Sequence, residues 1–156
     1  MNILVLGIGQ SLRGDDAAGL EAVSLWQKQY PDSAAPIHVE LTELPGLNLL
    51  DLLDGMDAAI LVDAVHAQAA PGALLRIGPD ELAAFTPETA SAHGWGVAET
   101  LHLGLSLYPA LAKVRITMIG IVGRQFNLGA GLSPEILAAI GEAANMIENE
   151  VQAALR

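Results

Sequence analysis

Apolar and polar positions alternate along the chain in two periods, one typical of strands and one typical of helices. Residues 1–6 form a nearly continuous apolar run that Gly7 and Gly9 close, which is the pattern of a short strand covered on both faces. A helical pattern follows over residues 16–29. Further strands are expected at residues 37–41, 59–62, 73–77 and 114–121, and further helices at residues 47–55, 80–85, 97–107 and 134–155.

This order of elements predicts the fold class. Strands that alternate with helices indicate an α/β sandwich with a mainly parallel sheet that helices cover on both faces. The polar alternation in residues 37–41 indicates a half-exposed strand, and residues 73–77 are expected near an edge of the sheet. Residues 86–96 show no period, so we expect a surface loop there. With no repeat or linker, residues 1–156 are expected to form one domain.

Composition narrows the classes of partner. Seven basic and 18 acidic side chains give a net charge of −11, which argues against binding to nucleic acids and to anionic membranes. No apolar run approaches the roughly 20 residues that a membrane span needs, and the N-terminus lacks the basic start of a signal peptide. The chain has no cysteine, which excludes disulfides, thiolate nucleophiles and sulfur-ligated metals. We therefore expect a soluble, cytoplasmic protein.

Three side chains stand where predicted strands end or loops open, namely Asp16, Asp63 and His93. In open parallel sheets, ligands bind at the carboxyl ends of the strands, so a crevice there could receive these groups. Two carboxylates and an imidazole form a mixed oxygen and nitrogen site that suits a divalent transition metal such as nickel, zinc or copper.

Each of these residues also has a purely structural interpretation. Asp15 or Asp16 could cap the first helix and complement its positive end. Asp63 could form a turn at the end of its strand, and His93 could be an exposed loop histidine. His66, three residues after Asp63, is a rival metal ligand or a second surface histidine.

Other catalytic and cofactor motifs are absent from the sequence. Ser11 lies near the acidic pair, but no Gly-x-Ser-x-Gly elbow surrounds it or occurs elsewhere. Gly7 and Gly9 begin a dinucleotide-binding fingerprint, yet Leu12 replaces its third glycine. Because no phosphate loop of the Walker type is present either, a nucleotide-binding module is a weak alternative.

Several segments resemble the maturation endopeptidases of nickel–iron hydrogenases. They are ILVLGIGQSLRGDDAAG near the start, ILVDAV at residues 60–65, SAHGWG around His93 and LSPEI at residues 132–136. The resemblance extends over nearly the whole chain, and its first block is the most specific.

The resemblance implies a three-layer α/β/α fold with a twisted sheet. It also implies an endopeptidase that removes a short C-terminal extension from a hydrogenase large-subunit precursor once nickel has been inserted. The family's metal-contacting positions fall on Asp16, Asp63 and His93, which are therefore the expected metal ligands and catalytic residues. The nickel is expected to come with the precursor as a recognition element, and other divalent metals are expected to substitute for it. A non-cleaving assembly factor that binds the loaded precursor is the alternative.

Overall fold

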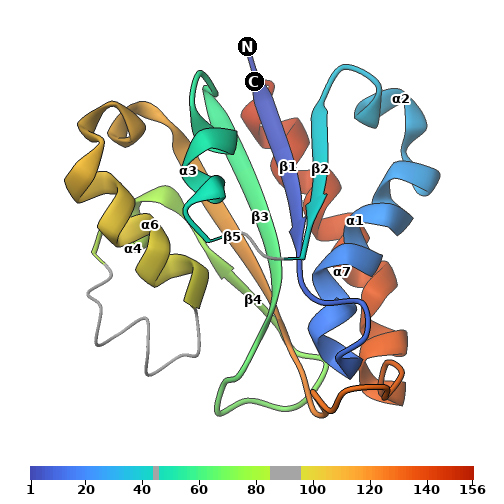
Figure 1. Cartoon of the computed structure of the whole chain (residues 1–156). Helices are drawn as coiled ribbons and strands as arrows, with labels where there is room; N and C mark the ends of the chain where they lie inside the picture. The colour runs from blue at the N-terminus through green and yellow to red at the C-terminus, as the bar shows by residue number, and fades with distance from the viewer. Residues whose placement is uncertain (44–45, 85–95) are drawn as a thin grey trace.

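The computed structural model describes residues 1–43, 46–84 and 96–156. Within these residues, strands and helices alternate, as Figure 1 shows. The strands are β1 (Ile3–Ile8), β2 (His38–Thr42), β3 (Ala58–Val65), β4 (Leu74–Ile77) and β5 (Arg115–Val122). The helices are α1 (Ala18–Gln29), α2 (Pro31–Ala34), α3 (Asn48–Leu53), α4 (Pro79–Ala83), α6 (Gly96–Leu107) and α7 (Pro134–Ala154), with 3-10 helices η1 (Gly14–Ala17) and η2 (Pro109–Lys113).

The strands form one sheet in the order β2-β1-β3-β5-β4. All neighbouring pairs are parallel except β4 and β5, which are antiparallel. The predictions that residues 73–77 lie near an edge and that the sheet is mainly parallel are confirmed. Periodicity alone could not show that β4 runs in the opposite direction.

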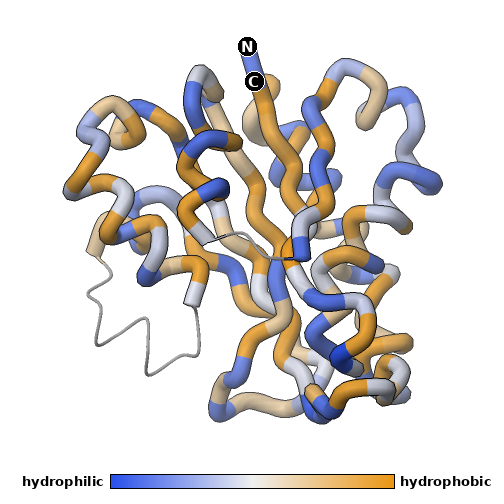
Figure 2. The backbone as a smooth tube through the Cα atoms, viewed as in Figure 1, coloured by the Kyte–Doolittle hydropathy of each residue, from blue (hydrophilic) through white to orange (hydrophobic). Residues whose placement is uncertain are grey.

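Helices cover both faces of this sheet, so the predicted three-layer α/β/α arrangement is confirmed. Figure 1 shows α1 and α7 on one face and α3, α4 and α6 on the other. Successive side chains of a strand point to opposite faces. Accordingly, Leu4 and Leu6 pack in the α3 and α6 layer, whereas Val5 packs in the α1 and α7 layer. In Figure 2 the central strands are correspondingly hydrophobic along most of their length.

The helix α7 buries one stripe of its surface against the sheet and α1. Ile136, Ile140, Ala143, Ile147 and Val151 recur at helical spacing and are buried. Ser133 and Pro134 occupy the N-cap and the first helical position. The Ser133 hydroxyl does not cap the helix, however, since it donates to Oδ2 of Asp15.

Two predicted strand boundaries are wrong in a way that matters for the site. The first strand extends through Gly7 to Ile8, because Gly7 pairs with both neighbouring strands. The third strand does not end at Asp63 but continues through Val65, with Asp63 opposite Gly120 of β5. Asp63 is therefore held by strand hydrogen bonding rather than by a turn. The surface loop predicted at residues 86–96 lies outside the described residues, except for Gly96, which begins α6.

Replacing Gly19 by alanine is expected to destabilise the fold by about 2 kcal/mol or more, because α1 packs directly against two strands there. A Cβ atom at Gly19 would lie 2.3 Å from the carbonyl oxygen of Val62 and 2.5 Å from that of Ile8. Gly141 in α7 is the matched control, since its Cβ would meet nothing within 4 Å. Urea unfolding should show a loss for Gly19→Ala and a small gain for Gly141→Ala. Equal midpoints for both variants would contradict this description of the helix–sheet contact.

Among the helices that the structure describes, none combines the length and the apolar character that crossing a bilayer requires.

Candidate functional site

Asp16 lies in η1, directly after the loop that follows β1, and its side chain is half-buried. The backbone N–H of Gln10 donates to Oδ2 of Asp16 at 3.0 Å, which fixes one carboxylate oxygen against this loop. Burial raises the pKa of Asp16 above its ordinary value, although the Gln10 hydrogen bond and the charges of His66 and Arg13 oppose the rise. Asp16 is thus a constrained carboxylate at the carboxyl edge of the sheet.

Asp63 lies near the carboxyl end of β3, the strand next to β1. Burial, followed by the negative charge of Asp16, raises the pKa of Asp63 to about 8. The charge of Asp16 thus acts on the Asp63 carboxyl group, and both residues lie at the carboxyl edge of the sheet. Near neutral pH this pair keeps a proton that two separate carboxyl groups would have lost.

Asp15 has a different role from that of its neighbour. Its side chain is fully buried, and its carboxylate accepts hydrogen bonds from the backbone N–H groups of Arg124, Gln125 and Ser133 and from the Ser133 hydroxyl. The N-cap residues of η1 and α1 are Arg13 and Ala17, so the interpretation of Asp15 or Asp16 as a helix cap is wrong, although both lie in the first turn of η1. Asp15 instead fastens the connection after β5 beside the site.

The hydrogen bonds to the Asp15 carboxylate also shift the pKa of this group. Burial alone would raise the pKa of Asp15, but the hydrogen bonds from Ser133, Gln125 and Arg124 outweigh it and hold the pKa below its ordinary value. These hydrogen bonds therefore stabilise the folded protein at pH values above the ordinary pKa near 3.8. This contribution is lost as the pH falls through the lower pKa that Asp15 has in the folded protein.

Replacing Asp15 by asparagine is expected to cost about 3 kcal/mol of unfolding free energy, because the amide nitrogen would face donors that then lack an acceptor. The exposed Asp54→Asn is the control. Guanidinium unfolding at pH 7 should separate the two variants clearly. Indistinguishable stabilities would show that the buried carboxylate does not fasten this connection.

His66 follows β3 directly and is exposed, but its ring is not free. It stacks on Phe126, with 3.9 Å between ring centroids and 26° between ring planes. Phe126 belongs to the connection after β5 that the hydrogen bonds of Asp15 hold in place. The Phe126 ring packs against Gly123, where a Cβ atom would lie 2.4 Å from Cζ of Phe126. The imidazole faces the acidic pair closely enough for its charge to lower the pKa of Asp16. No pattern in the sequence marks Phe126 as the stacking partner of His66.

The third predicted ligand, His93, lies outside the described residues. Among the residues described, no group of three imidazole, carboxylate or thiol side chains is arranged to hold a metal ion. Asp16 and Asp63 could offer two oxygen donors to a metal ion, which would need at least one further ligand.

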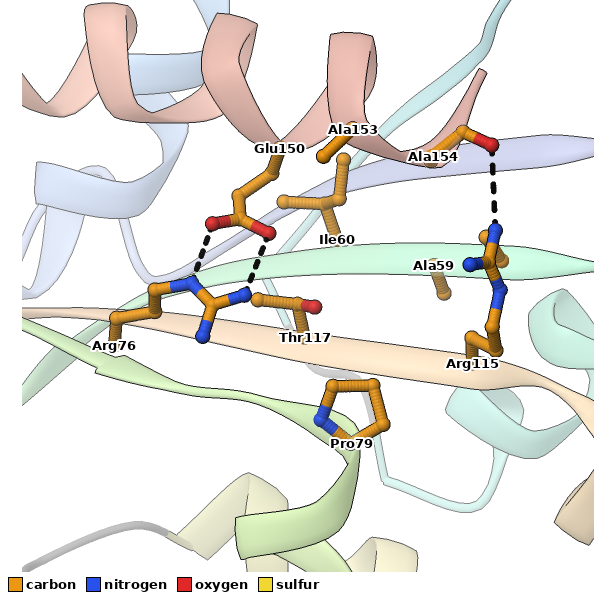
Figure 3. A pocket seen from close by; sticks show the side chains of 10 residues that line it. Ala59, Ile60, Arg76, Pro79, Arg115, Thr117, Glu150, Ala153 and Ala154 are labelled. Atoms are coloured by element: carbon orange, nitrogen blue, oxygen red, sulfur yellow. Dashed lines mark hydrogen bonds and ion pairs between the residues drawn. The ribbon is translucent and has the colours of Figure 1, made fainter. Parts of the chain in front are cut away.

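A separate pocket of about 130 Å³ lies at the opposite, amino edge of the parallel strands. Figure 3 shows the Arg76 guanidinium bound to both carboxylate oxygens of Glu150 in α7. Arg115 donates to the carbonyl oxygen of Ala154 at 3.2 Å. Both arginines therefore fasten α7 to the sheet, and this pocket lies away from the acidic pair.

Comparisons with known proteins show the family to which the chain is related. The hydrogenase maturation protease family model HycI matches residues 34–150. The chain is 30% identical over 159 residues to the hydrogenase 2 maturation protease of Escherichia coli strain K12, covering 100% of this chain and 92% of that protein.

Solved structures show the same fold. An endopeptidase from Escherichia coli, solved in solution, superposes with a TM-score of 0.77 at 29% identity, covering 100% of this chain and 93% of that one. The nickel–iron hydrogenase maturation protease HybD from Thermococcus kodakarensis superposes with a TM-score of 0.73 at 24% identity, covering 97% and 99%. By its sequence and its fold, this chain belongs to the hydrogenase maturation protease family.

Proposed function

We propose that the protein is an endopeptidase that removes the C-terminal extension of a nickel–iron hydrogenase large-subunit precursor after nickel has been inserted. Family membership supports a protease of hydrogenase maturation. The observation that carries the site assignment is the raised pKa of Asp63, which burial and the negative charge of Asp16 cause at the carboxyl edge of the sheet. We assign the catalytic and metal-contacting roles to Asp16, Asp63 and His93.

The acidic pair is suited to bind a cation that arrives with the substrate. Two neighbouring carboxylates, one of them largely desolvated, repel each other, and a divalent ion between them would relieve that repulsion and displace the retained proton. Carboxylate oxygens together with an imidazole nitrogen form a donor set that nickel accepts. The nickel is thus the substrate's own ion and reports that insertion is complete, and other divalent metals are expected to substitute.

Peptide hydrolysis needs a group that accepts a proton from water and a group that orients the scissile carbonyl. The Gln10 hydrogen bond fixes Oδ2 of Asp16, so we assign Oδ1 to the substrate side. One carboxylate of the pair accepts the proton of the attacking water as its oxygen adds to the carbonyl carbon. The same proton then passes to the leaving amine as the carbon–nitrogen bond breaks. Nickel on the precursor contributes by polarising the carbonyl.

The test compares nickel-loaded and nickel-free precursor as substrates of the purified protein. We expect the C-terminal mass of the large subunit to fall only in the loaded sample, as followed by mass spectrometry. Equal trimming of both samples would contradict nickel recognition. A stable complex without any shortened product would instead identify a non-cleaving assembly factor.

A further inference from the structure

A groove beside Asp16 presents two exposed leucines that the fold itself leaves uncovered. The groove encloses about 360 Å³, within the range of about 300–1,000 Å³ that is typical of ligand sites. It is lined by Gln10, Ser11, Leu12, Arg13, Glu43 and Leu128. We propose that this groove binds an extended, apolar segment of the precursor next to the scissile bond, an inference that rests on the proposed function.

The two leucines come from separate loops that hydrogen bonds hold together. Leu12 is 69% exposed and Leu128 is 72% exposed, and the N–H of Gly129 donates to the carbonyl oxygen of Leu12 at 2.7 Å. The N–H of Gly14 likewise donates to the carbonyl oxygen of Ala130 at 3.1 Å. Isolated exposed leucines are common on protein surfaces. Leu12 and Leu128 differ because they line the same groove and lie on two loops that are hydrogen-bonded to each other.

The part of the groove wall formed by Ser11 and Glu43 is also held in place. The backbone N–H and the hydroxyl of Ser11 both donate to Oε1 of Glu43, at 2.8 and 2.7 Å. The wall therefore does not have to be ordered when a ligand binds. Such preorganisation raises affinity because less conformational entropy is lost on binding.

The groove is continuous with the acidic pair. Gln10 lines it, and the N–H of the same residue donates to Asp16. At the Arg13 end, the carbonyl oxygen of Arg13 accepts the N–H of Asp16 at 3.1 Å. A peptide bound in the groove would therefore contact loop residues that are hydrogen-bonded to Asp16.

The side chains that line the groove indicate which kind of ligand it can bind. Leu12 and Leu128 offer apolar contact, while Arg13 and Glu43 contribute opposite charges that balance within the groove. This neutral, partly apolar surface belongs to a chain with a net charge of −11. It therefore suits an uncharged apolar peptide segment better than a nucleic acid or an anionic headgroup.

Leu12→Ala and Leu128→Ala are each expected to raise KM for the nickel-loaded precursor about tenfold, the order that burial of a leucine side chain contributes. The expected kcat is unchanged, because neither side chain touches the reacting atoms. Leu107→Ala is the matched control, since Leu107 is also exposed, at 58%, but lies at the end of α6. Thermal unfolding should be equal for all three variants.

The outcomes separate this inference from the proposed function. If the wild type trims the precursor and both groove variants keep the wild-type KM, the groove assignment is wrong while the endopeptidase assignment stands. If the wild type does not trim, the proposed function itself fails.

A cross-linking experiment identifies the occupant directly. A photoreactive residue at position 128 should cross-link to the precursor segment that flanks the cleavage site, whereas the same residue at position 107 should not. Cross-links from position 128 to a second copy of this chain, or to a distant part of the precursor, would overturn the proposal.

Discussion

Asp16→Asn and Asp63→Asn are each expected to lower kcat/KM for the nickel-loaded precursor by about 1,000-fold, the scale on which positioned acid–base groups contribute. An amide is a weaker metal donor than a carboxylate, and it cannot accept a proton from water. We assign Asp16 and Asp63 to one catalytic unit, and the charge of Asp16 raises the pKa of Asp63, so the double variant should lose little more than either single variant. Mass spectrometry of the large subunit over time provides the rates.

The control for these variants is Asp54→Asn, which removes an exposed carboxylate from the loop after α3. It should trim at the wild-type rate. Each site variant must also keep a cooperative unfolding transition, which shows that lost activity is not lost folding. Trimming at the wild-type rate by a folded Asp16→Asn protein would contradict the assignment of this carboxylate.

Asp63→Asn is also expected to stabilise the protein above pH 8 relative to the wild type. Burial and the negative charge of Asp16 raise the pKa of Asp63 in the folded protein to about 8, whereas the ordinary value is 3.8. The folded protein therefore binds this proton more tightly than the unfolded chain. The unfolding free energy of the wild type accordingly falls as the pH rises from about 4 to about 8.

Asparagine cannot ionise, so the unfolding free energy of the Asp63→Asn variant does not fall in this way as the pH rises. Since each pKa unit corresponds to about 1.4 kcal/mol, and Asp63 retains some contact with solvent, we expect a difference of about 4 kcal/mol at pH 8. The difference should shrink towards zero at pH 4. Guanidinium unfolding at the two pH values measures it, and the same difference at both pH values would show that Asp63 is not a buried, perturbed acid.

Much of the fold follows from local patterns in the sequence. The apolar run at residues 59–62 and the spacing of apolar residues in α7 each depend on neighbours within the same element, so periodicity detects them. The direction of β4 depends on its pairing with β5, which no local pattern encodes. The extension of β1 through Gly7 was missed for a related reason. Gly7 is a strand glycine because a Cβ there would lie 3.0 Å from the carbonyl oxygen of Gly19 on α1.

The site was predictable in part. The place of Asp16 and Asp63 at the carboxyl edge follows from the parallel topology. The different roles of the neighbours Asp15 and Asp16 were not predictable, since Asp15 accepts hydrogen bonds from residues more than 100 positions away. The stacking of His66 on Phe126 likewise joins two connections that are distant in sequence. The role of His93 remains a prediction.

The nickel environment offers the most direct test of the central claim. The X-ray absorption spectrum of nickel in the loaded precursor should be recorded alone, with an equimolar amount of wild-type protein before trimming proceeds, and with an Asp16→Ala, Asp63→Ala double variant. We expect the wild type to add oxygen and nitrogen neighbours to the nickel, and the double variant to add none of the carboxylate oxygens. An unchanged nickel spectrum in a complex that goes on to trim the precursor would contradict the claim that this site contacts the metal.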